Sequence, residues 1–395
     1  MADARPAGDP GRLSPPWVIV AGGFHFEGGM DKANAALALH LARSGASVEL
    51  VAHRIDQKLL EHPRITSHLV NLPRGSFLWG ERLLARKGEA VAKLAEARDP
   101  RTRVVVNGGN CAWPGINWVH YVHHAWRPRL RGAGPEDLKN AVAGRLFRRN
   151  ELRALREAKF LIANSDRTRR DLIQLIGIPA DRVETIYLGN DASWSEPTPQ
   201  ERADARRKFR IEGDHPVVVF VGALGSDDRK GFDTLWDAWL KLCGDPSWDG
   251  ELIVAGGGRT ISGWERKTSR AGMGSRIRFL GFIRDVDQLL AAADLLVSPV
   301  RYESYGLNVQ EAICRGLPAV VTESAGIAEK YPEALADLLL TRPDDSEEVA
   351  RVLREWRAGQ AHWQREFSLL GAVFRSYSWD DMARGFVQAV DRRFP

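Results

Sequence analysis

Short apolar runs recur along the chain, and most are followed by a longer segment whose apolar residues have helical spacing. In the second half the runs lie at 217–221, 251–255, 277–280 and 293–297, and the helical patterns at 232–242, 263–271, 286–293 and 309–315. Short, almost uninterrupted apolar runs are typical of parallel strands that are buried on both faces. The alternation of strand and helix therefore predicts right-handed βαβ units and a doubly wound α/β sheet.

The first half of the chain shows the same alternation less regularly. Strands are predicted at 17–21, 47–52, 103–107, 117–122, 160–163 and 183–186, and helices at 32–44, 77–97 and 166–176. Residues 1–16 are rich in Pro, Gly, Ala and charge and are expected to be a disordered tail. The proline-containing, weakly apolar stretch before residue 200 is the best candidate for a linker. We therefore predict two α/β domains, at 17–190 and 201–375, a linker at 191–200 and a terminal segment at 376–395.

Length, charge and cysteine content narrow the possible classes of protein. A chain of 395 residues suits two domains that each bury a core. The 56 basic and 51 acidic residues give a net charge of only +5, which argues against a dedicated nucleic-acid binder. The three cysteines are scattered, which is typical of a reducing cytosol. Without an apolar run of membrane-spanning length or a signal-peptide core, we expect a cytoplasmic protein, either soluble or peripheral on the inner face of the membrane.

The most informative stretch is 298–318. It follows a buried strand, holds Glu303 and Gly306 in a short polar loop, and then enters a helix that carries Glu311. In an open α/β sheet, ligands bind where a strand leads through a turn into a helix N-terminus. Carboxylates accept hydrogen bonds from sugar hydroxyls, and backbone N–H groups at a helix start hold phosphate oxygens. The stretch therefore suggests a nucleotide-sugar site.

A second interpretation is open for Glu311. Asn308 and Glu311 are three residues apart and have the form of a helix capping box. In such a box the glutamate only satisfies a backbone N–H group. The two interpretations predict different effects of replacing Glu311, on nucleotide binding or on folding stability.

A glycine-rich loop precedes the first predicted helix and contains Gly28, Gly29 and Met30. Backbone N–H groups in such a loop can approach an anion or a sugar closely. Glycines in these loops are as often present for turn geometry. The loop is a candidate for contacts to an acceptor or a diphosphate.

Three histidines, His120, His123 and His124, lie near the carboxyl end of the strand at 117–122. A metal site is one hypothesis, but period-two geometry sends His120 and His123 to opposite faces, and no carboxylate or thiol lies at ligand spacing. A packed or capping histidine is the other structural interpretation. No metal ligand set is therefore predicted.

The segment 127–159 holds ten basic and four acidic residues in what reads as an amphipathic helix. The default interpretation is a solvated face. The functional one is attraction to an anionic membrane surface or to a phosphorylated acceptor.

Several of these pieces resemble the large retaining glycosyltransferase family 4. Glu303 and Glu311 with the seven residues between them resemble its E-x7-E signature. Further similar pieces follow in the family's order: Gly28-Gly29, Ala163-Asn164-Ser165, Gly189-Asn190-Asp191, Lys230-Gly231, Phe279-Leu280-Gly281 and a terminal helix after Ser378. The resemblance implies the GT-B fold, with two Rossmann-like domains facing each other across a cleft and the last helix crossing back to the first domain. It also implies transfer with retention of anomeric configuration, without a bound metal or other cofactor.

The resemblance assigns roles position by position. Glu303 would act on the donor sugar, Lys230 on the diphosphate, and Glu311 on the ribose. A histidine at the end of the strand would face the donor sugar, with His123 as first choice and His120 as second. The remaining expected donor contacts are Gly306 and Leu307 through their N–H groups, Tyr305, Gly222, and Gly281, Phe282 and Ile283 for the base.

The chain departs from the family beside Gly222. Most relatives have an arginine directly after this glycine, whereas this chain has Ala223. Either Arg229 or Arg301 is expected to supply the missing cation. Alternatively, Arg229 is a solvent-exposed loop residue.

The expected substrates are a UDP- or GDP-linked sugar and an acceptor hydroxyl of a saccharide, a lipid-linked molecule or a small molecule. Rival hypotheses are a GT-B epimerase or phosphorylase, against which the E-x7-E series argues, and a non-catalytic protein that binds sugar nucleotides or anionic lipids.

Overall fold

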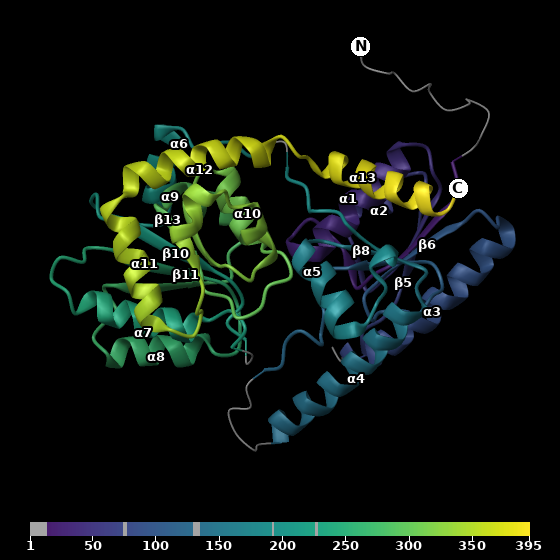
Figure 1. Ribbon diagram of the computed structural model, residues 1–395, viewed down its shortest axis with the longest axis horizontal. Coiled ribbons are helices and arrows are strands. Elements are labelled where there is room, and N and C mark those ends of the chain that lie inside the picture. The colour runs from purple at the N-terminus through teal and green to yellow at the C-terminus, as the bar shows by residue number, and fades with distance from the viewer. Residues whose placement is uncertain (1–13, 74–76, 129–134, 192, 226–227) are drawn as a thin grey trace, which may run out of the picture.

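The computed structural model describes residues 14–73, 77–128, 135–191, 193–225 and 228–395. It contains two parallel sheets side by side, each with helices packed against it (Figure 1). The expected tail lies outside the described residues except for 14–16, which lead into the first strand. In the part of the chain that the structure describes, no helix combines the length and the apolar character that spanning a bilayer requires.

The sheet of the first domain has seven parallel strands in the order β5-β3-β1-β6-β7-β8-β9. Its strands are β1 (Trp17–Val20), β3 (Val48–Ala52), β5 (Ile65–Leu69), β6 (Arg103–Asn107), β7 (Ile116–Val119), β8 (Phe160–Ala163) and β9 (Val183–Thr185). A small parallel pair is formed by β2 (Gly23–Phe24) and β4 (Arg54–Ile55). The helical elements are α1 (Gly29–Arg43), α2 (Gln57–Leu60), α3 (Phe77–Arg98), α4 (Pro135–Glu157), α5 (Asp166–Asp171), the π-helical turn η2 (Leu172–Ile176) and η3 (Ala180–Arg182).

Strand β1 shows why the apolar runs are nearly continuous. Trp17 and Ile19 face a core that includes residues of α1 and of the last helix, whereas Val18 and Val20 face a core with Leu84 of α3. Both faces of the strand are covered, so every side chain must be apolar.

The sheet of the second domain has six parallel strands in the order β12-β11-β10-β13-β14-β15. Its strands are β10 (Val217–Val221), β11 (Glu251–Ala255), β12 (Ile277–Gly281), β13 (Leu295–Ser298), β14 (Ala319–Thr322) and β15 (Leu339–Leu340). Its helical elements are α6 (Pro199–Lys208), α7 (Phe232–Cys243), α8 (Ile261–Arg270), α9 (Val286–Ala292), α10 (Leu307–Cys314), η4 (Gly326–Lys330), η5 (Glu333–Leu338), α11 (Ser346–Ala358) and α12 (Gln360–Arg375).

The last helix, α13 (Trp379–Arg393), runs from the second domain back over the first and packs against α1 (Figure 1). Ser378 caps it, in a capping box with Asp381. Beside the cap, Asn190 and Ser378 form an isolated parallel bridge. The chain therefore passes between the domains twice, and the two passages touch.

Strand order reverses at corresponding places in the two sheets. In the first sheet β1 lies between β3 and β6, and in the second β10 lies between β11 and β13. Loops that leave neighbouring strands in opposite directions open a crevice at the carboxyl ends of those strands. In the second domain this crevice lies between the loops that follow β10 and β13, where the stretch 298–318 lies.

Candidate active site

The loops after β10 and β13 bring Lys230 and Glu303 into contact. Lys230 Nζ lies 2.5 Å from Glu303 Oε2, and both side chains are largely buried. Burial by itself would raise the pKa of Glu303, but the charges of Lys230 and Arg229 outweigh it, so the pKa is lowered. Glu303 is therefore an ionised carboxylate at neutral pH, held next to two cations.

Gly231 allows the two loops to pack this closely. Its φ is +68°, and a Cβ at this position would lie 1.9 Å from the carbonyl oxygen of Pro299. The N–H of Arg301 donates to the carbonyl of Arg229 at 2.8 Å and ties the two loops together. The Lys230-Gly231 pair of the sequence thus combines a cation with the backbone geometry that places it.

Helix α10 begins where a phosphate would be expected to bind. Gly306, with φ +116°, is its N-cap residue, and no side chain caps the helix. The first N–H groups of a helix have no partner within it, and they carry the positive end of its dipole. Asn308 instead donates to the carbonyl of Val221 at the end of β10, at 2.9 Å. The capping-box interpretation of Glu311 is therefore wrong, because the helix begins at Leu307 and not after Asn308.

Glu311 lies on the first turns of α10. Burial raises its pKa to about 7, although the charge of Lys32 on α1 opposes that shift. Lys32 forms an ion pair of 2.6 Å with Asp191, directly after the passage between domains. The carboxyl group is thus close to proton balance at neutral pH, between elements of both domains.

Tyr121 connects the histidines of the first domain to the second domain. Its ring centroid lies 4.9 Å from that of His123 and 5.2 Å from that of Tyr302. The guanidinium of Arg229 lies over the same ring at 5.3 Å. His123 is therefore on the side of the first domain that faces Arg229, Lys230 and Glu303.

His120, the second choice for the donor sugar, occupies a different environment. Its ring is buried against Trp118, with centroids 4.4 Å apart, and burial lowers its pKa to about 3. Strand β7 ends at Val119 rather than at 122, so His120 turns into the core and His123 falls in the following turn. Only the backbone carbonyl of His120 reaches the second domain, where it accepts from Ser304 Oγ at 2.5 Å.

A buried carboxylate on α4, Glu151, holds the other two histidines. Its Oε1 lies 2.9 Å from His123 Nδ1 and its Oε2 lies 2.9 Å from His124 Nδ1. Among the described residues, no group of three or more His, Cys, Asp or Glu could hold a metal ion.

Arg301 and Tyr305 are not placed for the roles expected of them. The Arg301 side chain is 5% exposed and pairs with Asp233 and Asp344. It cannot reach a diphosphate without breaking its pairs with Asp233 and Asp344. The Tyr305 hydroxyl donates to Gln310 inside the protein. Arg301 is instead held by Asp233 and Asp344, which are distant in the sequence, and Tyr305 by Gln310 in the helix that follows it.

The remaining predicted donor contacts lie along the same edge of the second sheet. The N–H of Gly222 donates to Ala255 O at 3.0 Å. Gly281 ends β12 with φ +67°, followed by Phe282, which is 72% exposed, and the partly buried Ile283. An aromatic face this exposed at a sheet edge could stack on a base.

In the first domain, Gly28 and Gly29 both have positive φ and lead into α1, and Met30 is exposed. The expected glycine loop at a helix N-terminus is therefore present.

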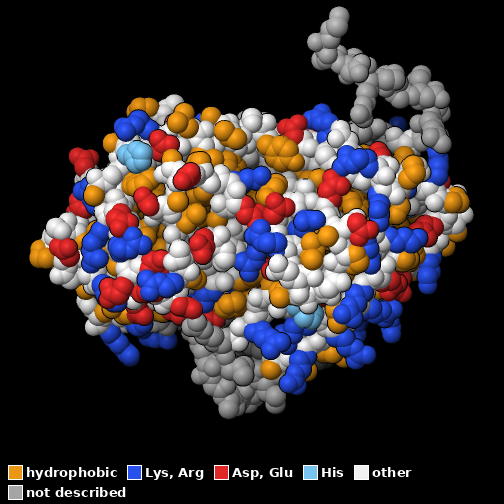
Figure 2. Space-filling model, in the orientation of Figure 1, with side chains coloured by type: hydrophobic (Ala, Val, Ile, Leu, Met, Phe, Trp, Pro, Cys, Tyr) orange, Lys and Arg blue, Asp and Glu red, His pale blue; other side chains and the backbone are white. Residues whose placement is uncertain are grey.

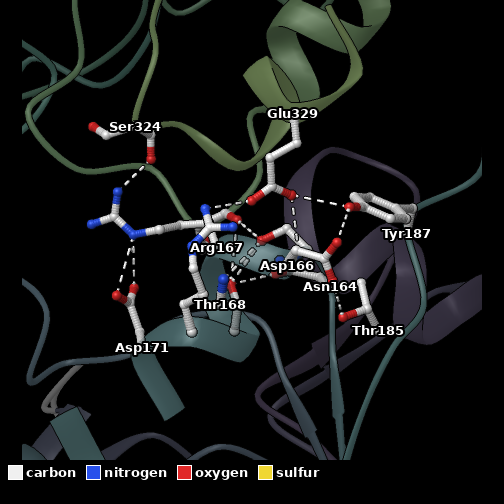
Figure 3. Close-up of polar contacts among 12 residues, drawn as sticks. Asn164, Asp166, Arg167, Thr168, Asp171, Thr185, Tyr187, Ser324 and Glu329 are labelled. Atoms are coloured by element: carbon white, nitrogen blue, oxygen red, sulfur yellow. Dashed lines mark hydrogen bonds and ion pairs between the residues drawn. The ribbon is translucent and has the colours of Figure 1, made fainter. Parts of the chain in front are cut away.

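Polar contacts join the two domains next to Glu303 in the chain, at Ser304. Ser165 Oγ of the first domain donates to the carbonyl of Ser304 in the second at 2.5 Å, and within the second domain the N–H of Gly326 donates to the carbonyl of Glu303 at 3.2 Å. Next to them, Glu329 of the second domain accepts from Arg170, the Asp166 N–H and the Tyr187 hydroxyl of the first (Figure 3). The orientation of the two domains and the position of the Glu303 loop thus share one network.

A cavity of about 520 Å³ lies in the first domain between α3, α4 and the loop after β6. Its wall includes Trp79, Glu81 and Asn150, together with the guanidinium groups of Arg82 and Arg153. Burial raises the pKa of Glu81 to about 7, partly opposed by the charge of His123. The cavity therefore offers hydrogen-bonding, aromatic and cationic groups close to His123.

The expected basic segment forms α4, although residues 129–134 lie outside the described part. Figure 2 shows Lys and Arg side chains gathered over the region where Figure 1 places α3 and α4. Val142 of α4 and Trp79 of α3 are 47% and 61% exposed. Apolar and basic side chains thus share this surface.

Sequence reasoning missed Tyr121, Glu151, Lys32 and Asp191. Tyr121 stands within the histidine cluster, and Asp191 within a segment singled out above, so both carried a weak signal. Glu151 and Lys32 carried none, because each is one charged residue among many on a helix.

Two family models match the chain. The one for Glycosyltransferase Family 4 matches residues 27–194, and the one for Glycosyl transferases group 1 matches residues 215–357. A GDP-mannose-dependent alpha-(1-6)-phosphatidylinositol dimannoside mannosyltransferase of Mycobacterium tuberculosis is 32% identical over 202 residues, 48% of this chain and 51% of that protein. The chain spans 57% to 62% of the length of three other curated relatives that it matches.

Solved structures show the same fold. WaaG, a glycosyltransferase involved in lipopolysaccharide biosynthesis, has a TM-score of 0.73 at 21% identity, covering 95% of this chain and 98% of that one. HepE of Anabaena, in complex with UDP and glucose, has a TM-score of 0.67 at 20% identity, covering 96% and 100%. The expected GT-B fold of two Rossmann-like domains is thereby confirmed.

Proposed function

Because the chain belongs to the glycosyltransferases that the group 1 and family 4 models describe, we propose that it transfers a glycosyl group from a nucleoside-diphosphate sugar to an acceptor hydroxyl. The transfer retains the anomeric configuration and serves the biosynthesis of a polysaccharide, glycolipid or other glycoconjugate. The solved relative with UDP and glucose and the GDP-mannose-dependent relative support a UDP- or GDP-linked donor.

One observation carries the proposal, namely the pairing of Lys230 with Glu303 beside the uncapped start of α10. A diphosphate that accepts hydrogen bonds from the helix N-terminus would meet Lys230 and Arg229 at its other oxygens. Negative charge grows on the leaving diphosphate during transfer, and fixed cations with a helix dipole stabilise it. Once Lys230 turns to the phosphate, Glu303 is free to face the sugar.

The acceptor binds on the first-domain side, in the cavity between α3 and α4. The position of Glu81 in that cavity, within the electrostatic reach of His123, supports this assignment. A carboxyl group near proton balance accepts or donates a hydrogen bond to an acceptor hydroxyl. A saccharide with neighbouring hydroxyls fits these polar walls, with Trp79 as a surface for a sugar ring.

A labelled nucleotide-sugar panel tests the proposal, with the wild type compared with Glu303→Gln. Transfer or slow hydrolysis of one donor is expected. The variant should keep nucleoside-diphosphate affinity but lose at least about a hundredfold in turnover, since the lost contact acts in the transition state. Epimerisation of the donor, with no transfer of the glycosyl group to an acceptor or to water, would contradict the proposal, as would an unchanged rate in the variant.

A further inference from the structure

Glu151 is the most enclosed charged side chain close to the site. It lies on α4, its side chain is 0% exposed, and both of its oxygens face the turn that follows β7. Oε1 accepts from the backbone N–H of His123 at 2.8 Å and contacts Nδ1 of the same residue at 2.9 Å. Oε2 contacts His124 Nδ1 at 2.9 Å. One carboxylate thus engages two consecutive imidazoles and the backbone N–H of the first of these residues.

The charge of Glu151 decides which ring nitrogens carry protons. Burial alone would raise its pKa, but the hydrogen bonds that it accepts from His123 and His124 outweigh burial and lower it. An ionised carboxylate can only accept hydrogen bonds, so Nδ1 of each ring must donate. A neutral imidazole has one N–H, and Nε2 of both rings is then left as an acceptor.

The neighbours of His123 leave its Nε2 as the ring nitrogen that can accept a hydrogen bond from substrate. Its ring meets Tyr121 edge-on and lies 5.8 Å from Phe147, and the side chain is 40% exposed. His124 is less open, at 25%. With Nδ1 held by Glu151, the exposed edge of His123 can accept a hydrogen bond from a substrate hydroxyl.

We propose that Glu151 is a positioning residue that fixes His123 and His124 as Nδ1–H tautomers, so that His123 Nε2 accepts a hydroxyl of the substrate. The hydrogen bond from a substrate hydroxyl rests on the proposed glycosyl transfer. The assignment of the two tautomers does not depend on that function. Glu151 acts through the histidines and does not itself touch substrate.

Two substitutions of Glu151 should affect the tautomers of His123 and His124 differently. In Glu151→Gln the amide oxygen can still accept from the His123 N–H and Nδ1–H, whereas the amide NH₂ must face His124 and donate to its Nδ1. His124 then changes to the Nε2–H tautomer and His123 does not. In Glu151→Met, of similar length, neither ring keeps its acceptor. Glu157→Gln, on the exposed end of the same helix, is the matched control.

The tautomers are measured by nitrogen-15 NMR of labelled imidazoles, without substrate. We expect Nδ1–H for His123 and His124 in the wild type and in Glu157→Gln, and a change of His124 alone in Glu151→Gln. An Nε2–H tautomer of His123 in the folded wild type would overturn the assignment. This measurement decides the tautomers even if no donor is turned over.

Kinetics then test the positioning role. Losing a charge-assisted hydrogen bond is worth about 10- to 100-fold, so Glu151→Met should lower kcat by about that factor with the nucleoside-diphosphate Kd unchanged. Glu151→Gln should stay within a few-fold of wild type, as should Glu157→Gln. A folded Glu151→Met enzyme with full kcat would overturn the role, and a large loss in Glu151→Gln would assign it to His124 instead of His123.

Discussion

Glu303 stays ionised despite its burial because Lys230 and Arg229 lower its pKa. Breaking a buried ion pair by removing one partner is costly, since the remaining charge stays desolvated. Substrate offers a natural exchange, because a diphosphate can replace Glu303 as the partner of Lys230.

Replacing Arg229, Lys230 and Arg301 one at a time should have different effects on nucleoside-diphosphate binding. Arg229→Ala and Lys230→Ala should each weaken nucleoside-diphosphate binding by about tenfold or more, since a charged hydrogen bond contributes roughly 1.5 to 3 kcal/mol. Arg301→Ala should instead lower the free energy of unfolding by about 1.5 to 3 kcal/mol, because it removes the buried partner of Asp233 and Asp344, which are themselves partly exposed. Calorimetric titration and thermal melts on all three variants would check this. Weakening by Lys230→Ala alone would show that a single cation suffices.

The raised pKa of Glu311 predicts the direction in which folding stability changes with pH. Between its ordinary value of 4.5 and about 7, the folded state keeps a proton that the unfolded chain releases. Stability from this group is therefore full at low pH and is lost as the pH rises through 7. Glu311→Gln should raise the Tm above pH 7, with the difference vanishing below about pH 4.5.

The same variant should weaken nucleoside-diphosphate binding by up to about tenfold, because a neutral amide accepts a weaker hydrogen bond from the ribose than a carboxylate does. Melts from pH 4 to 9 and titrations at pH 8 measure the two effects. A more stable variant with unchanged affinity would remove Glu311 from the nucleotide site.

At the scale of elements, α4 has two faces with different tasks. Its buried face carries Glu151 to the histidines, while its outer face carries basic and apolar side chains. Each basic residue near an anionic membrane contributes about 1 kcal/mol, and the attraction fades beyond a Debye length of about 8 Å at physiological salt. We propose that this face docks on a membrane.

Reversing Arg145, Arg148 and Arg149 to Glu should abolish sedimentation with anionic liposomes and spare transfer to a soluble acceptor. Reversing Arg266, Arg270 and Arg354, which are exposed on the second domain, is the control and should leave sedimentation intact. Binding that persists in high salt, or in the α4 variant, would argue against docking through this face.

At the scale of the whole molecule, the domains are joined by the two chain passages and by the network at Glu329. Three donors of the first domain converge on this one carboxylate (Figure 3). Since Ser165 and Gly326 hydrogen-bond the Glu303 loop at the same junction, a change in domain orientation should also move Glu303.

Glu329→Ala should therefore loosen the junction. We expect a larger radius of gyration in X-ray scattering and a loss of about 2 kcal/mol in unfolding free energy, the scale of hydrogen bonds to a charged group. Glu333→Ala, an exposed neighbour on η5, is the control. Unchanged scattering with unchanged stability would mean that the chain passages alone set the domain orientation.

Local patterns were sufficient to predict most of the fold. The strands at 103–107, 160–163, 217–221 and 251–255 begin and end as predicted, because strands covered on both faces need continuous apolar runs. Strand β5 was missed for the converse reason, since it is an edge strand with exposed Thr66 and Ser67. The helix expected at 166–176 changes into a π-helical turn after Asp171, a change that periodicity does not signal.

The sequence by itself determined the order of strands and helices, the family, and the loop that carries Glu303 into α10, since these depend on neighbours in the chain. Only the tertiary structure showed that Arg301 is paired with Asp233, that His120 is buried in the core, and that His123 is held by Glu151. Asp233, 68 residues away in the sequence, forms an ion pair with Arg301, and Glu151, 28 residues away, hydrogen-bonds His123. Whether a polar side chain meets substrate or a buried partner depends on contacts between elements, which no local pattern records.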